Sequence, residues 1–233
     1  MEQSLNAPPA TTSQSANLRR TTYLRKTMTL FGREHETHVG QRFLLWVDAV
    51  GGFLVCLADE VTLGQPDPTR GVDVPILGDL SARHVRIRRD AEGYLAQVRR
   101  PIKLNGRPVE DAAPLSADCE LEMGAGVRLR FRRPHPLSNT ARLQFLSRHR
   151  TQPSTDGVIL MAESLVLGPG PACHVHCPGW PREVILYRQG AEIWCRATGV
   201  LEIDGQRHAD GCGRVSLDSH VSGDDFTLSL ESL

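Results

Sequence analysis

Three short motifs in the first half of the chain combine residue types that often line binding sites. Gly64 ends a strand-like segment, Ser81-Ala-Arg-His84 begins seventeen residues later, and Asn105-Gly106 lies between two further strand-like segments. A hydroxyl and an imidazole can each donate and accept hydrogen bonds. Asn-Gly favours a type I′ hairpin turn, because both central residues of that turn need positive φ. Taken singly, each motif has an ordinary structural explanation, and only their combination suggests a site.

A second group of residues, Cys173-His-Val-His-Cys177, contains four potential zinc ligands. On a strand, His174 and His176 would face one side while Cys173 and Cys177 face the other, so the four cannot converge on one tetrahedral ion. We therefore expect a strand with buried thiols and outward-facing histidines, and no metal. Nearby prolines keep a loop conformation open, and with it the alternative of a metal- or redox-linked protein that uses these four residues.

The sequence lacks the motifs of common enzyme classes. It contains no GxSxG nucleophile elbow, no glycine-rich loop leading to Lys-Ser or Lys-Thr, and no HExxH zinc motif. Gly168-Pro-Gly-Pro cannot form a phosphate cradle, because proline has no backbone N–H group. We therefore expect a protein that is not an enzyme and that uses no cofactor.

Composition limits the partners that the chain can attract. Lys plus Arg and Asp plus Glu number 27 each, so the formal net charge is zero. This balance removes the long-range attraction that favours nucleic acid or an anionic membrane. The fully apolar runs Phe43–Val47 and Val158–Ala162 have five residues each, and the longest, Phe53–Ala58, has six, far fewer than the roughly 20 that span a bilayer. We expect a cytoplasmic protein with neither partner, whose six cysteines are mostly buried thiols.

The elements that position the motifs have the pattern of short strands. From Arg42 onward, apolar or alternating segments are separated by Gly, Pro or Asp turns, and no window shows a helical pattern. Turn signals every 8 to 12 residues predict an all-β, mostly antiparallel sandwich. Residues 1–40 are polar, and we expect a disordered tail there. The nine segments before residue 134 are Phe43–Val47, Phe53–Leu57, Val61–Gly64, Val74–Leu77, Val85–Arg89, Tyr94–Val98, Ile102–Leu104, Glu120–Met123 and Val127–Phe131.

Alternation in the segment Val127–Phe131 places its arginines on one face. The apolar residues point to one side, which leaves Arg128 and Arg130 on the other. Such a stripe of arginines is usually a solvated face of a sheet. The alternative is a docking surface for an acidic partner.

After residue 134 the pattern of segments begins again. Val61-Thr-Leu-Gly64 is echoed by Leu165-Val-Leu-Gly168, and Ile102-Lys-Leu-Asn-Gly-Arg107 is echoed by Leu201-Glu-Ile-Asp-Gly-Gln206. The echoes predict two tandem β-sandwiches, at residues 41–135 and 136–233. A single larger sandwich is the alternative.

The three motifs of the first copy, in their order and spacing, resemble a forkhead-associated domain over roughly residues 42–133. That family carries Gly-Arg, Ser-x-x-His and Asn-Gly on the loops at one end of an eleven-stranded sandwich, and it binds phosphothreonine peptides. The resemblance implies that Ser81 donates to the phosphate, Asn105 holds the bound peptide, and His84 ties the loop. Gly64 would permit a sharp exit from its strand, and Gly106 would complete the turn.

Two positions of the first copy depart from the family pattern. Gln65 stands where the family usually has Arg, and Ala82 stands where it usually has a polar or basic residue. Arg83 or Arg70 would restore part of the missing charge. A hydrogen bond to a charged group contributes about 1.5–3 kcal/mol, so Gln65 is expected to weaken phosphate binding by about ten- to a hundredfold.

The second copy departs further from the family pattern. Gly168 is followed by Pro169, no Ser-x-x-His follows it before residue 204, and Asp204-Gly205 replaces Asn-Gly. An aspartate in that position would repel a phosphate group. We therefore expect a degenerate forkhead-associated-like unit that packs or binds protein without reading phosphate.

These observations predict a non-catalytic signalling module that binds a phosphothreonine-containing protein or peptide. The chain's own Arg19-Arg-Thr-Thr22 suits basophilic kinases, so a phosphorylated Thr21 or Thr22 is one candidate ligand. Tethering would raise its effective concentration at the first copy. The alternative is a scaffold whose phosphate site has decayed and which binds protein independently of phosphorylation.

Overall fold

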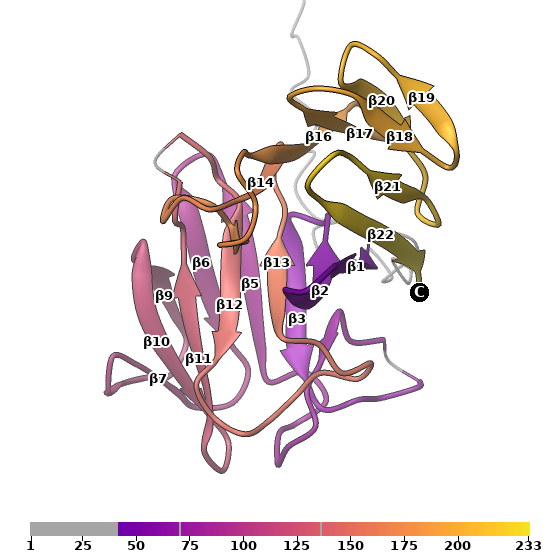
Figure 1. The fold of residues 1–233 in the computed structure, drawn as a ribbon. Helices are drawn as coiled ribbons and strands as arrows, with labels where there is room; N and C mark the ends of the chain where they lie inside the picture. Colours follow the sequence, from indigo (N-terminus) through magenta and orange to yellow (C-terminus); the bar gives the residue numbers. More distant parts are fainter. Residues whose placement is uncertain (1–41, 70, 136) are drawn as a thin grey trace, which may run out of the picture. The chain divides into compact units, whose positions relative to one another are not determined.

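The computed structural model describes residues 42–69, 71–135 and 137–233, in which the chain forms strands and no helix. The expectation of an all-β fold is confirmed (Figure 1). The first eleven strands are β1 (Arg42–Val47), β2 (Gly51–Cys56), β3 (Glu60–Gly64), β4 (Val74–Pro75), β5 (Val85–Asp90), β6 (Gly93–Val98), β7 (Ile102–Leu104), β8 (Arg107–Val109), β9 (Ala112–Leu115), β10 (Asp118–Met123) and β11 (Val127–Arg132). The next eleven are β12 (Ala141–Phe145), β13 (Gly157–Leu160), β14 (Ser164–Gly168), β15 (Val175–His176), β16 (Val184–Gln189), β17 (Glu192–Ala197), β18 (Leu201–Ile203), β19 (Gln206–His208), β20 (Cys212–Val215), β21 (His220–Ser222) and β22 (Thr227–Ser232).

The strands pair in three sheets. One has twelve strands in the order β19-β18-β21-β22-β1-β2-β13-β12-β11-β10-β7-β8, and the other two have five strands each, β4-β3-β5-β6-β9 and β15-β14-β16-β17-β20. Only the pairs β2–β13, β3–β4 and β14–β15 among the named strands are parallel. The sheets are therefore mostly antiparallel, as the alternating segments predict.

The two halves of the chain follow one plan. In the first half, β3 pairs with β4 and β5, β5 pairs with β6, and β6 pairs with β9. In the second half, β14 pairs with β15 and β16, β16 pairs with β17, and β17 pairs with β20. The order β10-β7-β8 likewise recurs as β21-β18-β19. Each strand of the first half thus corresponds to the strand numbered eleven higher.

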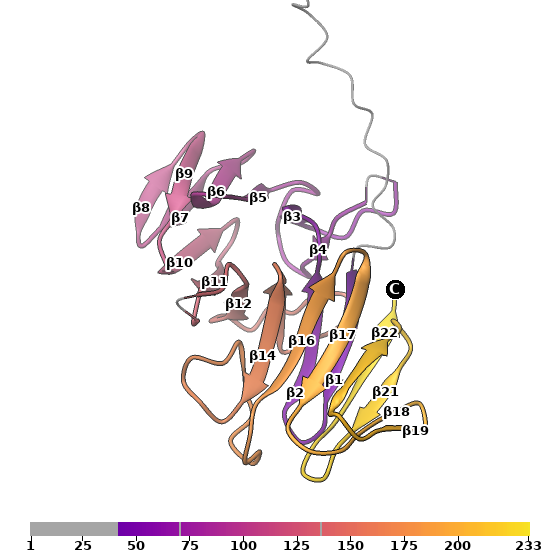
Figure 2. The same cartoon turned by 90° about the horizontal axis from the view of Figure 1, so that it is seen from above.

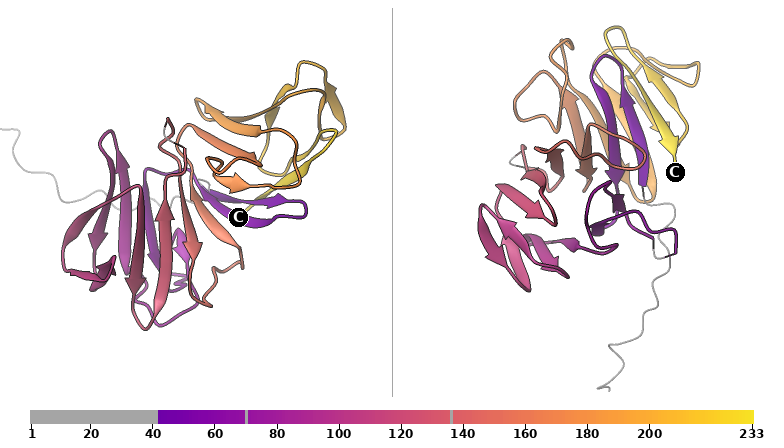
Figure 3. Two further views of the ribbon diagram at one scale, coloured as in Figure 1. Left: turned by 60° about the vertical axis from the view of Figure 1, so that its left-hand side comes forward. Right: turned by 90° about the horizontal axis from the view of Figure 1, so that it is seen from below.

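The first hairpin of each half is exchanged between the two sandwiches. β1 pairs with β22, Phe43 lying opposite Ser232, whereas β11 pairs with β12, Phe131 lying opposite Leu143. Figure 2 shows β1 and β2, in indigo, among the orange and yellow strands of the second half. One sandwich therefore consists of β3 to β13, and the other of β14 to β22 with β1 and β2 (Figure 3). Residues 41–135 and 136–233 each contribute strands to both sandwiches.

Two hydrophobic cores lie on opposite faces of β1, β2 and β13. Leu44, Leu54 and Val158 belong to the first core, while their neighbours along the strands, Phe43 and Ile159, belong to the second. Both faces of these strands are buried, which explains why their sequences are continuously apolar instead of alternating. The parallel pairing of β2 with β13, Phe53 opposite Gly157, joins the sandwiches, and the described residues belong to one compact unit.

Because adjacent residues of β1 face different cores, substitutions of Phe43 and of Leu44 are expected to destabilise different sandwiches. Phe43→Ala removes a buried side chain from the second core, and Leu44→Ala removes one from the first. Substitutions of this kind cost roughly 2–5 kcal/mol. We expect Phe43→Ala to lower amide hydrogen-exchange protection mainly in β16 and β17, and Leu44→Ala to lower it mainly in β3 and β5. Loss of protection in β3 and β5 upon Phe43→Ala would contradict the exchange.

Candidate functional site

The end of β3 and the Ser81 loop are held together by the backbone. Gly64 is the last residue of β3, and a Cβ there would overlap the carbonyl oxygens of Ser81 and Ala82. The next residue, Gln65, donates its backbone N–H to the Ser81 carbonyl oxygen at 3.1 Å. The glycine is therefore required by the close approach of the loop, and Gln65 and Ser81 are neighbours in space.

His84 lies at the base of the same loop and is buried. Its N–H donates to the Leu63 carbonyl oxygen at 2.9 Å, and its own carbonyl oxygen accepts from Arg99 and Arg100. Its Nδ1 accepts from the Ser81 N–H at 3.3 Å and lies 3.5 Å from the Ser81 Oγ. Burial lowers the pKa of His84, so the ring is neutral at pH 7. The imidazole thus holds the Ser81 loop, while the backbone of His84 connects it to β3 and to the segment after β6.

Asn105 and Gly106 form the two-residue turn between β7 and β8, with φ of 48° and 79°. The Asn105 Oδ1 accepts from the Glu120 N–H at 2.8 Å, which fastens the turn to β10. Asp204 and Gly205 repeat this arrangement, with φ of 52° and 80°, and the Asp204 Oδ1 accepts from the His220 N–H at 2.8 Å. Both positions therefore need a side-chain oxygen that accepts from the neighbouring strand.

The remaining residues of the predicted phosphate site are less closely connected to the Ser81 loop. Arg83 is half-buried within the Ser81 loop, and Gln65 is exposed beside it. Hydrogen bonds in the described part of the chain connect Gln65, Ser81 and His84, but none connects Asn105 to Ser81. Arg70, Thr21 and Thr22 lie outside the described residues.

In the second half, a tryptophan occupies the position that corresponds to Ser81. Leu63 pairs with Val85 in the first half, and Leu167 pairs with Val184 in the second, so Val85 and Val184 are equivalent positions. Ser81 lies four residues before Val85, and Trp180 lies four residues before Val184. Trp180 is buried against Phe226, with ring centroids 5.2 Å apart. A packed indole therefore replaces the hydroxyl in the second sandwich.

The segment Cys173–Cys177 differs in one respect from the expected strand. Cys173 and Cys177 are buried and His176 is exposed, as expected, but His174 is fully buried instead of facing outward. Its Nδ1 accepts from the Val166 N–H at 3.0 Å, and its ring stacks on His135 with centroids 6.2 Å apart. The expectation for His174 is wrong because β15 has only two residues, so strand alternation does not reach position 174.

Neither metal binding nor a reactive thiol is supported by this segment. Among the residues that the structure describes, no group of three or more His, Cys, Asp or Glu side chains is arranged to hold a metal ion. Burial raises the pKa of the Cys177 thiol to about 11 and also raises that of Cys173. At neutral pH both sulfurs are therefore protonated, and a thiol is a weak nucleophile.

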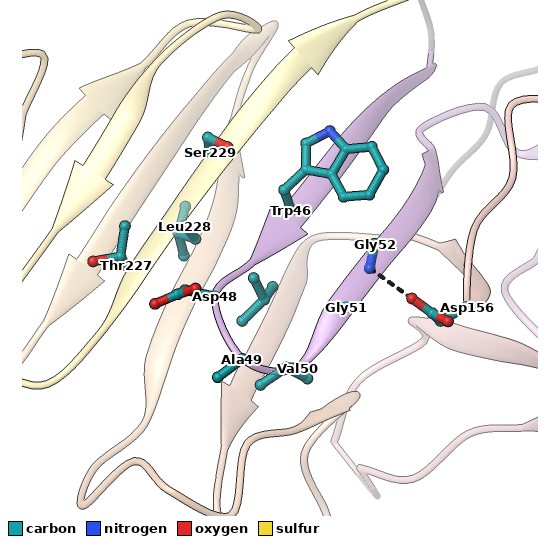
Figure 4. A pocket seen from close by; sticks show the side chains of 11 residues that line it. Trp46, Asp48, Ala49, Val50, Gly51, Gly52, Asp156, Thr227, Leu228 and Ser229 are labelled. Atoms are coloured by element: carbon teal, nitrogen blue, oxygen red, sulfur yellow. Dashed lines mark hydrogen bonds between the residues drawn. The ribbon is translucent and has the colours of Figure 1, made fainter.

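An open hollow of about 540 Å³ lies beside the turn between β1 and β2 (Figure 4). Trp46 lies over Gly52, where a Cβ would overlap the indole ring. The Gly52 N–H donates to the Asp156 Oδ2 at 2.9 Å, and the Trp46 Nε1–H donates to Glu231 at 2.7 Å. Because these polar groups already have partners within the protein, the hollow does not require a ligand.

A second pocket, of about 320 Å³, is lined by residues that the sequence does not bring together. Its charged and titratable side chains come from β11, from β12 and from the segment before and in β15. Two features of the sequence contain its members: the arginine stripe of Val127–Phe131 includes Arg130, and the segment Cys173–Cys177 includes Cys173, His174 and His176. The lining residues are Arg130, Arg132, Pro134, Arg142, Gln144, Pro171, Cys173, His174 and His176.

In comparisons with known proteins, no family model and no curated protein matches this chain. Within the described residues, no helix is long and apolar enough to cross a membrane. The candidate sites are therefore interpreted from their own geometry.

His174 gives a prediction for the dependence of stability on pH. Burial, and then the neighbouring His135, lower the pKa of His174 to about 4, whereas an unfolded chain has a value near 6.5. The contribution of the neutral His174 ring to the free energy of unfolding is therefore full above pH 6.5 and is lost as the pH falls toward 4. We expect His174→Asn, which keeps an acceptor for the Val166 N–H, to reduce the loss in unfolding free energy between pH 7 and 5 by about 2 kcal/mol. Urea denaturation of both proteins at the two pH values measures it, and equal losses would contradict the burial of a neutral ring.

Proposed function

We propose that the chain is a non-catalytic interaction module whose first sandwich, β3 to β13, binds a phosphothreonine-containing peptide at the Ser81 loop. The observation that carries the proposal is the hydrogen bond from the Gln65 N–H to the Ser81 carbonyl oxygen. It brings the Gly-Gln turn and the Ser-x-x-His loop together, as the resemblance to the forkhead-associated family requires. The sandwich also has the eleven strands of that family.

The proposed contacts follow from the chemistry of the loop. The half-buried Ser81 hydroxyl donates to a phosphate oxygen, because a charged acceptor makes a stronger hydrogen bond than a neutral one. Arg83, in the same loop, supplies positive charge, and Gln65 supplies a neutral amide where the family has Arg. Losing one charged hydrogen bond of about 1.5–3 kcal/mol implies an affinity about ten- to a hundredfold lower than with Arg.

The second sandwich has a different role in this proposal. The buried Trp180 stands in the place of Ser81, and the Asp204 carboxylate would repel a phosphate group. We propose that this sandwich supports the first through the shared sheet and does not read phosphate. A reducing, cytoplasmic setting fits the six free cysteines. It also fits the kinases that would phosphorylate the proposed peptide.

Binding to peptides tests the proposal directly. Fluorescence anisotropy of the full chain is measured with a degenerate phosphothreonine library, with its unphosphorylated and phosphoserine counterparts, and with peptides around Thr21 and Thr22. We expect saturable binding that requires phosphothreonine and that weakens at least about tenfold in Ser81→Ala. If binding is independent of phosphate, the scaffold alternative replaces the proposal.

Asn105 and Asp204 offer a matched pair of substitutions. Asn105→Asp keeps the side-chain oxygen that accepts from Glu120, and Asp204 shows that an aspartate fits this turn. We expect the melting temperature to change little, while phosphopeptide affinity falls at least about tenfold through lost amide donation and charge repulsion. Asp204→Asn is the control for affinity, which should not change; its melting temperature is expected to fall, because the Asp204 Oδ2 accepts from the buried Ser219 hydroxyl at 2.8 Å. Unchanged affinity in Asn105→Asp would limit Asn105 to its structural role.

A further inference from the structure

The pocket of about 320 Å³ lies between the outer face of β11 and β12 and the segment of the second half that contains β15. We call it the arginine pocket, defined by Arg130, Arg132, Arg142, His174 and His176. The inward-facing residues of β11 and β12 belong to the first core, so the arginines project from the opposite face of these strands. The pocket is remote in sequence from the Ser81 loop, and its case is independent of the proposed peptide site.

Positive charge in the arginine pocket exceeds the negative charge beside it. Arg132 and Arg142 are directly opposite each other on β11 and β12, and like charges in that arrangement repel. Asp118 is the carboxylate that pairs with the arginines here, at 2.6 Å from Arg130 and 3.7 Å from Arg132. One carboxylate therefore serves two of the arginines. The third, Arg142, forms no salt bridge in the described part of the chain, although the Asp156 carboxylate is close enough to raise its pKa.

Arg142 is partly buried without an ionic partner among the described residues. Its Nη1 donates to the His174 carbonyl oxygen at 3.4 Å, and its guanidinium lies 5.3 Å from the centroid of the Phe53 ring. Its Nε is buried and has no acceptor. Burial, and then the neighbouring Arg132, lower the pKa of Arg142. The folded protein thus holds a cation in a place where removal from water disfavours charge.

His174 contributes a second unsatisfied donor to the same pocket. Because its Nδ1 accepts from the Val166 N–H, the proton of the neutral ring is on Nε2. The side chain is fully buried, and Nε2 has no acceptor within hydrogen-bonding geometry, although the Thr140 backbone interacts with the ring and raises its pKa. Buried donors without acceptors are rare in folded proteins and often mark the place of a missing ligand or ion. Arg142 and His174, which carry two such donors, both line the arginine pocket.

We propose that the arginine pocket binds the phosphate group of a small phosphorylated molecule. Three arginines and two histidines line the space, and a phosphate offers several acceptor oxygens with up to two negative charges. The volume is at the lower end of the range for small-molecule pockets, so it accommodates the phosphate and a small organic part. Gln144 and His176 at the exposed rim are placed to contact that part.

Calorimetric titration of the full chain tests this site. The probes are inorganic phosphate, O-phosphothreonine and adenosine monophosphate, each against sodium chloride at equal ionic strength. We expect saturable binding with one site per chain and at least a tenfold loss of affinity in Arg142→Gln. A preference for one ester over inorganic phosphate would identify the organic part that the rim contacts.

Control variants separate this site from the surrounding charges and from the peptide site. Arg128→Gln removes an arginine of the same strand that pairs with Glu120 at 3.5 Å and lies outside the pocket, so it should bind phosphate normally, as should Ser81→Ala. If Arg142→Gln does not fold, Arg132→Gln removes an exposed pocket arginine and is expected to show the same loss. Absence of saturable binding, or equal affinity in the pocket variants and Arg128→Gln, would overturn the proposal. Loss of binding in Ser81→Ala alone would also overturn it.

Discussion

The pairing of β1 with β22 joins the first and last strands of the described residues, with Phe43 opposite Ser232, and most other features of the architecture depend on it. An unpaired strand exposes backbone N–H and C=O groups and invites association with other chains. Without a hairpin to cover it, β11 in the first half and β22 in the second half would each be such an edge. β1 covers β22 and β12 covers β11, so each half is completed by strands of the other.

This exchange couples the two cores through single strands. Successive residues of β1, such as Phe43 and Leu44, face different cores, and β13 divides in the same way. The continuous sheet therefore transmits packing changes from one sandwich to the other more directly than a flexible linker would. The exchange also sets β12 beside β11, and it thereby places Arg142 opposite Arg132.

Comparison of the two halves separates structural from functional roles within the proposed peptide site. At equivalent turns, the Oδ1 atoms of Asn105 and Asp204 each accept from the neighbouring strand, and the Oδ2 of Asp204 also accepts from Ser219, which accounts for these residue types without any ligand. Ser81 and Trp180 differ completely in chemistry at equivalent positions, so the first half retains a polar loop where the second is packed. Zero net charge likewise conceals a local excess of positive charge in the arginine pocket.

The sequence by itself determined the features that depend on local backbone chemistry. Alternating and apolar segments predicted nine of the eleven strands of the first half, all but β8 and β9. Asn105-Gly106 predicted a tight turn with positive φ, and the echo of Gly64 in Gly168 marked equivalent strand ends. These features follow from a few neighbouring residues, because side-chain alternation and turn geometry are local.

Only the tertiary structure decided which strands are neighbours and which polar groups lack partners. A strand's pattern of apolar residues states that it is buried but not against which strand, so the pairing of β1 with β22 was invisible in the sequence. His174 departed from the expected alternation because its burial is set by Val166 and His135, from other segments. The arginine pocket arises for the same reason: its residues come from strands and a loop that meet only after the hairpins are exchanged.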